Sequence, residues 1–175
     1  QALQYFQQAR ELFTAVFDVD NLAFINNTLG GIYKNYGDLG QASAYYEYAR
    51  QTFIKNGNRG NLSMVLGNIA YIQHKNGLHE LVLDTLANAL ENARVTGYKR
   101  VETGITIALG EVYRDLGDLK KSIELFNEAL TIARETQDSN FVAYSKAGLG
   151  ETYRIIGDLE KAEDWTKEAL AQAQT

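Results

Sequence analysis

Residues 109–117, L-G-E-V-Y-R-D-L-G, decide the fold because the same pattern returns at residues 29–37 (L-G-G-I-Y-K-N-Y-G) and 149–157 (L-G-E-T-Y-R-I-I-G). Residues 69–77, I-A-Y-I-Q-H-K-N-G, complete a series with a spacing of 40 residues. Alanine keeps the same spacing at Ala9, Ala49, Ala89, Ala129 and Ala169. Self-similarity at a fixed period indicates a tandem array of one structural unit, in which each unit packs on its neighbours.

Each unit contains two helical patterns separated by glycine. In the first unit the apolar positions 25, 29, 32, 33 and 36 mark one helix face, and positions 42, 46, 49 and 53 mark a second. Between them, Gly37 suits a left-handed helix end and Asp38 can cap the next helix. Small residues at 30, 70, 110 and 150 are expected where the two helices cross. The sequence predicts an all-α, right-handed α-solenoid of nine antiparallel helices, near residues 1–17, 21–36, 39–56, 61–76, 79–96, 100–116, 119–136, 140–156 and 159–174.

The composition excludes several classes of protein. Hydrophobic residues make up 45% and charged residues 22%, which is ordinary for a folded domain. The chain has no cysteine, so it forms no disulfide and no thiolate metal site. It has no apolar run of about 20 residues and no signal-peptide pattern, and a net charge of -5 argues against a nucleic-acid-binding face. We therefore expect a cytoplasmic piece of a longer protein, since the first residue is Gln1.

The repeated motifs resemble the tetratricopeptide repeat (TPR) family. L-G-G-I-Y, L-G-E-V-Y and L-G-E-T-Y match the first helix of that repeat, and A-S-A-Y-Y-E-Y-A and S-I-E-L-F-N-E-A match the second. The resemblance implies a single array, with residues 1–17 as the second helix of a preceding repeat and four repeats at 21–57, 61–97, 101–137 and 141–175. The period of 40 exceeds the usual ~34 residues, and the closing proline is absent. The sequence is therefore similar to a long-repeat branch that includes kinesin light chains, Pins-type scaffolds and the TPR regions of bacterial signalling ATPases and maltose-activator-type regulators.

No pattern of catalytic or metal-binding residues is evident. The only histidines, His74 and His79, flank Gly77 and would not share a helix face. No nucleophile–base constellation or phosphate loop is present, so we expect neither enzymatic activity nor a cofactor. Glu111 and Glu151 each precede an arginine by three residues, which favours ion pairs on the helix surface over a catalytic carboxylate pair.

The resemblance implies that the first helix of each repeat lines a concave groove that binds a partner. One position after the tyrosine column, the inward row contains Lys34, His74, Arg114 and Arg154, which we predict to contact an acidic or phosphorylated segment. Charges that complement the helix dipole are an equally good explanation of this row. The remaining predicted contact residues are Asn27, Asn68, Tyr71, Glu111, Glu151 and Tyr144. Gly67, Gly104 and Gly148 fit either a closely approaching ligand or tight helix packing.

Two functions remain open on the sequence alone. The first is a non-catalytic protein–protein interaction module that binds a partner segment in its concave groove. The alternative is a sensory or effector-docking region of a larger bacterial signalling ATPase or transcription regulator. In either case the expected partner is a protein or peptide, and neither a nucleic acid nor a membrane. Apolar residues at both ends of the array also predict self-association through stacking or helix exchange.

Overall fold

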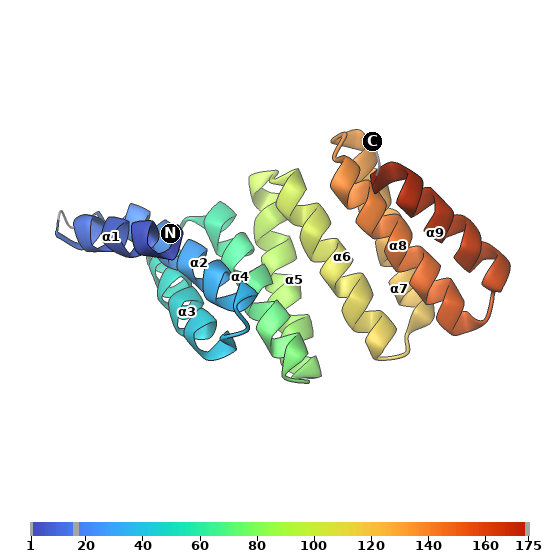
Figure 1. The fold of residues 1–175 in the computed structure, drawn as a ribbon, viewed down its shortest axis with the longest axis horizontal. Coiled ribbons are helices and arrows are strands. Elements are labelled where there is room, and N and C mark those ends of the chain that lie inside the picture. Colours follow the sequence, from blue (N-terminus) through green and yellow to red (C-terminus); the bar gives the residue numbers. More distant parts are fainter. Residues whose placement is uncertain (1, 16–17, 174–175) are drawn as a thin grey trace.

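The computed structural model describes residues 2–15 and 18–173, which form nine α-helices and no strand (Figure 1). The predicted all-α solenoid is confirmed, and the helix ends agree with the predicted ones to within two residues. The predicted ends at residues 1, 17 and 174 lie outside the described residues. The helices are α1 Ala2–Ala15, α2 Val19–Asn35, α3 Leu39–Lys55, α4 Arg59–Lys75, α5 His79–Thr96, α6 Lys99–Asp115, α7 Leu119–Glu135, α8 Ser139–Ile156 and α9 Leu159–Ala173.

The turns between helices follow one design. Gly37 ends the α2 turn with a φ of 81°, and Asp38 then caps α3 by accepting the backbone N–H of Gln41 at 3.0 Å. Gln137 adopts the same left-handed region, with a φ of 55°, between α7 and α8. The N-cap positions of α5 and α6 are Leu78 and Tyr98, and neither makes a side-chain cap hydrogen bond.

Two helices begin two residues earlier than the sequence predicts. We expected helices from residues 21 and 61, whereas α2 begins at Val19 and α4 at Arg59. Asp18 and Asn58 are their N-caps, accepting the N–H groups of Asn21 at 3.1 Å and Asn61 at 3.2 Å. A cap residue accepts from the second or third helical N–H, so each helix starts directly after its cap.

Close packing within the hairpins explains the column of small residues. α2 packs on α3, α4 on α5, α6 on α7 and α8 on α9. A Cβ atom on Gly30 would lie 2.5 Å from the Tyr46 ring, and one on Gly110 would lie 3.1 Å from the Phe126 ring. These large side chains are almost fully buried, so the helix that faces them is restricted to a small residue at the crossing point.

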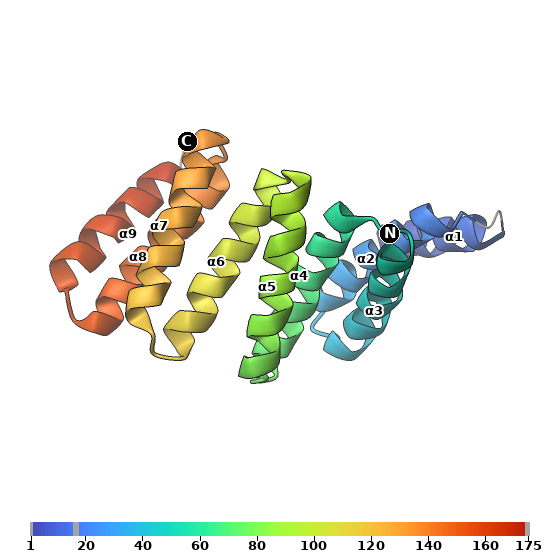
Figure 2. The same cartoon turned by 180° about the vertical axis from the view of Figure 1, so that it is seen from behind.

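The solenoid is concave on the face made by the even-numbered helices. Figure 1 shows α6 and α8 on the side toward the viewer, and Figure 2, seen from behind, shows α5 and α7 in front. Within the described residues, α4 contacts α2 and α6, and α6 contacts α8, whereas α3, α5 and α7 do not contact one another. The first helices therefore lie closer together than the second helices, which bends the array around them.

The two ends of the array expose apolar side chains. α1 packs on α2, and Arg10 of α1 lies over the Tyr45 ring. Tyr5 and Leu12 of α1 are 70% and 68% exposed, and Leu170 of α9 is 60% exposed. Self-association through these ends and the division into repeats remain predictions.

Candidate functional site

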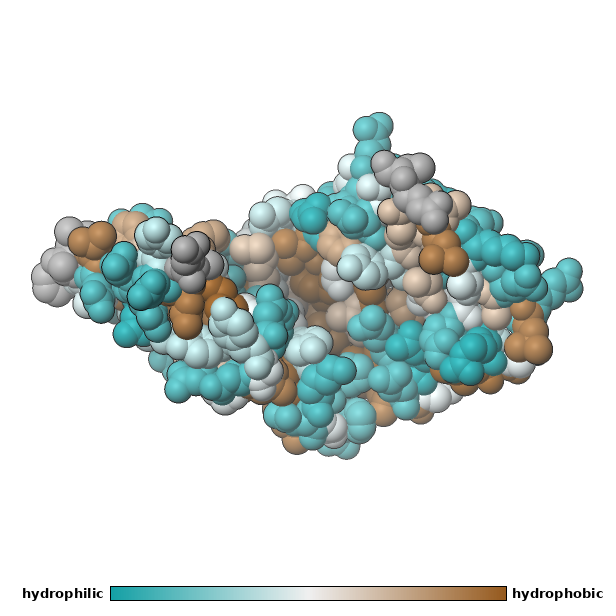
Figure 3. All heavy atoms as spheres, in the orientation of Figure 1, coloured by the Kyte–Doolittle hydropathy of each residue, from teal (hydrophilic) through white to brown (hydrophobic). Residues whose placement is uncertain are grey.

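The groove contains an apolar pocket between α4 and α6 with a volume of about 390 Å³. Figure 3 shows it as a hollow lined by hydrophobic residues in the middle of the concave face. Met64 of α4, Val101 and Ile105 of α6, and Phe141 of α8 supply the apolar lining. The opening faces solvent, so an apolar side chain of a partner could enter it.

Three residues that line this pocket lower the stability of the helices that contain or follow them. Gly67 and Gly104 lie inside helices, where glycine costs about 1 kcal/mol relative to alanine. Their Cβ positions are 3.8 Å from Ile105 and 3.4 Å from Phe141, so packing leaves room for alanine at 67 and nearly so at 104. Tyr98, also in the lining, occupies the N-cap of α6 without capping it. Local choices that oppose stability are expected at functional sites.

For Gly148, the structure decides between the two explanations, a closely approaching ligand or tight helix packing. A Cβ atom there would lie 2.3 Å from the Phe126 ring, so this glycine allows helices to pack closely. Ile107 occupies the same repeat position as Asn27 and Gly67, but it is a buried core residue. The 40-residue columns therefore do not assign every concave position correctly.

Two asparagine side chains, Asn27 and Asn68, lie at the edge of the pocket, and their predicted contact with a partner stays a prediction. Asn68 donates a hydrogen bond to the amide oxygen of Asn27 at 3.2 Å, and this bond joins α4 to α2. Among the described residues, the side-chain amide nitrogen of Asn27 and the amide oxygen of Asn68 have no hydrogen-bond partner. One donor and one acceptor are thus open to a peptide main chain.

The predicted row of cations is largely neutralised by neighbouring carboxylates. His74 Nε2 lies 3.0 Å from Asp115 Oδ2, and Arg114 Nε lies 3.5 Å from Asp115 Oδ1. Arg154 forms a two-bond fork with Glu151, at 2.8 and 2.7 Å. The expected Glu151–Arg154 ion pair is therefore confirmed. The expected Glu111–Arg114 pair is wrong, because Arg114 pairs with Asp115 instead.

Lys34, the remaining member of the row, has a different environment. Its ammonium group lies 5.0 Å from the centre of the Tyr71 ring, and Lys75 approaches the same ring at 5.7 Å. Neither lysine has a carboxylate within ion-pair distance among the described residues. Burial lowers the pKa of Lys34 below its ordinary value, because the ammonium has lost solvent without gaining a counter-charge.

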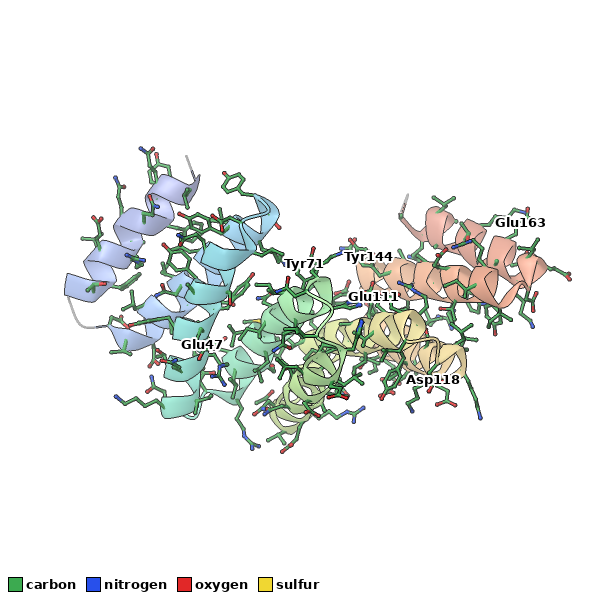
Figure 4. All side chains as sticks on the ribbon, turned by 90° about the horizontal axis from the view of Figure 1, so that it is seen from below. Glu47, Tyr71, Glu111, Asp118, Tyr144 and Glu163 are labelled. Atoms are coloured by element: carbon green, nitrogen blue, oxygen red, sulfur yellow. The ribbon has the colours of Figure 1, made fainter. Side chains whose placement is uncertain are left out.

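Glu111 also lies in the groove. Figure 4 shows Tyr71, Glu111 and Tyr144 pointing from α4, α6 and α8 toward it, whereas Glu47, Asp118 and Glu163 point elsewhere. Burial raises the pKa of Glu111, and the charges of Arg114, His74 and Lys75 oppose that rise. The Arg154 hydrogen bonds instead lower the pKa of Glu151. The two carboxylates thus occupy the same column in different environments.

Sequence reasoning missed part of the site. Lys75, Tyr98, Val101 and Phe141 were not selected, although Lys75 follows His74 directly and Tyr98 replaces a polar cap residue. Arg100 was missed too; its guanidinium lies 5.2 Å from the centre of the Phe141 ring and it pairs with Asp138. An uncapped aromatic at a cap position is the signal that could have identified Tyr98.

The two histidines lie near each other across the turn between α4 and α5. The rings of His74 and His79 lie 6.4 Å apart although they belong to different helices. Over residues 2–15 and 18–173, no group of three or more possible ligands is arranged to hold a metal ion. None of the helices described there is both long and apolar enough to cross a membrane.

Residues 102–175 match the family model described as Tetratricopeptide repeat. The fold is a TPR-like solenoid. No curated protein sequence matches the chain. Among solved structures, BtubC (BKLC) from P. vanneervenii is 22% identical with a TM-score of 0.79, over 97% of this chain and 73% of that one.

Two further TPR-like neighbours are similar in structure. Aspartyl phosphate phosphatase F from Bacillus subtilis has a TM-score of 0.86 at 14% identity, over 99% of this chain but only 45% of its own. A kinesin light chain from Podosopora anserina with nearly identical TPR-like repeats has a TM-score of 0.70 at 15% identity, over 98% of this chain and 85% of that one. At these identities the likeness establishes the fold and leaves the branch of the family open. The TPR fold is generally a non-catalytic protein-interaction fold.

Proposed function

We propose that this chain is a protein-interaction module that binds an extended partner segment along the concave groove. The observation that carries the proposal is the apolar pocket between α4 and α6, bordered by the open amide groups of Asn27 and Asn68. Pockets for side chains combined with polar groups for the main chain are how extended peptides are recognised. Tyr71 and Tyr144 add exposed aromatic surface to the groove.

The charged residues of the groove have secondary parts in this proposal. Arg114 and Arg154 are ion-paired and His74 lies within hydrogen-bond distance of Asp115, so these residues shape the field along the groove rather than each binding one anion. Glu111 and Glu151 offset that field and disfavour unselective binding of polyanions. Electrostatics of this kind affect the rate of encounter and the register more than the affinity.

Peptide selection with two matched blocking variants tests the proposal. A phage-displayed random peptide library is selected on the wild-type chain, and selected peptides are then measured on Gly67→Trp and Ala87→Trp. Gly67 lines the concave pocket, and Ala87 lines a pocket on the opposite, second-helix face. We expect Gly67→Trp to weaken binding about tenfold or more, and Ala87→Trp to leave it unchanged.

Circular dichroism and a thermal melt show whether each variant is folded. If Gly67→Trp does not fold, Gly67→Leu is used in its place. Selected peptides that lose affinity only on Ala87→Trp, or on neither variant, would place recognition outside the groove. That result would overturn the proposal.

The second candidate is a docking region within a larger regulator. It is favoured by one observation, that the chain spans only 45% of aspartyl phosphate phosphatase F while matching it over 99% of its own length. A solenoid of this shape is therefore compatible with a longer protein that carries further segments. In a longer protein, the activity of an attached domain would then differ between the partner-bound and the partner-free state. An identical activity in both states would exclude this candidate.

A further inference from the structure

Two lysine ammonium groups lie over the Tyr71 ring, and neither is paired with a carboxylate of the described residues. The Lys34 and Lys75 ammonium groups lie 5.0 and 5.7 Å from its centre, and neither forms an ion pair among the described residues. The ring quadrupole attracts each ammonium, but the two like charges repel each other. An anion bound beside the ring would remove that repulsion.

The carboxylates of the groove do not fill this role. Asp115 is engaged by His74 and Arg114. Glu111 is near enough to Lys75 to feel its charge, yet it lies outside ion-pair distance. Lys34 is left half-buried with no carboxylate partner within the described part of the chain. A partner is therefore the natural source of the missing negative charge.

The distance to the pocket limits the spacing of a partner motif. Gly67 lines the pocket, and Tyr71 and Lys75 follow it by four and eight residues on α4. At ~1.5 Å per helical residue, these positions lie about 6 and 12 Å farther along the helix. An extended peptide advances ~3.3 Å per residue, so about two to four of its residues cover that distance.

We propose that the groove recognises an extended segment at two points: an apolar side chain that enters the α4–α6 pocket, and an Asp or Glu side chain, two to four residues away, that binds between Lys34 and Lys75 beside Tyr71. This inference rests on the proposed function and adds the chemistry of the partner. We choose a carboxylate because it is the anionic group of the unmodified Asp and Glu side chains, and Glu111 lies nearby and repels any bound anion.

Defined peptide pools test the two-point motif. Short fluorescein-labelled peptides carry one fixed Leu and one fixed Glu two, three or four positions away, with Ala, Ser, Thr and Gln mixed elsewhere. Matched pools replace the Glu by Gln or phosphoserine, or the Leu by Ser. Fluorescence anisotropy with the wild-type chain should show the Glu pool binding about three- to tenfold more tightly than the Gln pool, and salt should reduce the difference.

Charge-removing variants assign that difference to residues. Lys34→Gln and Lys75→Gln should each reduce the preference for Glu over Gln while keeping the preference for Leu over Ser. Lys161→Gln on α9 is the matched control, because Lys161 also lies over a tyrosine ring, Tyr153 at 5.1 Å, but is paired with Asp158 at 2.7 Å. We expect the control to retain the full preference for Glu.

The outcomes separate this inference from the function on which it rests. Pools that bind, are blocked by Gly67→Trp and show no preference for Glu would overturn the two-point motif and leave groove binding intact. A phosphoserine pool that binds more tightly than the Glu pool would overturn the choice of a carboxylate. Pools that bind equally well to Gly67→Trp would overturn both proposals.

Discussion

Gly30 and Gly67 both lie inside first helices, but the structure gives them opposite functions. A Cβ atom at position 30 would lie 2.5 Å from the buried Tyr46 ring, whereas one at position 67 would have its nearest neighbour, Ile105, at 3.8 Å. Gly30→Ala should therefore lower the free energy of unfolding by about 1–3 kcal/mol through overpacking. Gly67→Ala should raise it by up to about 1 kcal/mol, because alanine favours the helix.

Urea unfolding followed by circular dichroism measures both variants under one condition. A stabilised Gly67→Ala variant that also binds peptide less well would show that this glycine exists for the pocket at a cost in stability. A Gly67→Ala variant that is clearly destabilised would contradict the idea that the fold has room for a side chain there.

Side-chain pairing was the least predictable part of the site. The columns of small residues and of tyrosines are visible in the sequence because three of the four repeats keep Gly and Tyr there, with Ala70 and Gln73 in the second repeat. The partner of His74 is Asp115, which lies 41 positions away and has Asn35, Lys75 and Ile155 at the equivalent positions of the other repeats. Such a contact depends on the side-chain rotamers of one repeat only, so it leaves no repeating pattern in the sequence.

At the scale of helices, Glu102 connects α6 to its neighbours. Its buried carboxylate accepts hydrogen bonds from Arg94 of α5 at 3.1 Å and Lys99 at 2.9 Å, and Arg94 also binds Glu128 of α7 at 2.6 Å. Burial alone would raise the pKa of Glu102, but these two cations hold the pKa below its ordinary value. The ionised carboxylate therefore stabilises the fold.

Glu102→Gln should lower the free energy of unfolding at pH 7 by about 1–3 kcal/mol, since hydrogen bonds to a charged group are lost. A carboxyl with a depressed folded pKa stabilises the fold above its unfolded pKa, and this stabilisation disappears as the pH falls through the folded value. The difference between variant and wild type should thus shrink below about pH 4.

Chemical unfolding at neutral and acidic pH measures this difference. The exposed pair of Glu163 and Lys167 provides the control, because Glu163→Gln should leave the stability nearly unchanged at either pH. A Glu102→Gln deficit that stays constant down to pH 3 would assign the effect to packing rather than charge.

Helix existence and approximate length were predictable from the sequence, because the apolar period of each helix is clear. The starts of α2 and α4 were misplaced by two residues, since the cap positions of Asp18 and Asn58 lie outside the apolar pattern. The pocket was partly predictable. Gly67 and Asn68 were recognised as inward positions, whereas Tyr98 and Phe141 reach the same space from a turn and from another helix.

For the whole molecule, the division of the described core into separate clusters has consequences for unfolding. Most buried apolar residues of the described chain form three clusters, the first in α2–α4, the second in α4–α7 and the third in α6–α8, with Trp165 of α9 packed against it. In such an array stability is a sum over units and their interfaces, and a unit can open while others stay folded. Phe126 of α7 is the largest buried residue of the third cluster and packs against Gly110 and Gly148.

Phe126→Ala should remove about 3–5 kcal/mol of stabilisation from that cluster. We expect hydrogen–deuterium exchange to accelerate strongly in α6–α9 and only weakly in α2–α4, because the first cluster shares no buried residue with the third. Phe53→Ala in the first cluster is the reciprocal variant and should show the opposite distribution. Equal acceleration along the whole chain in both variants would mean that the array unfolds as one cooperative unit, and the groove would then open and close only with global unfolding.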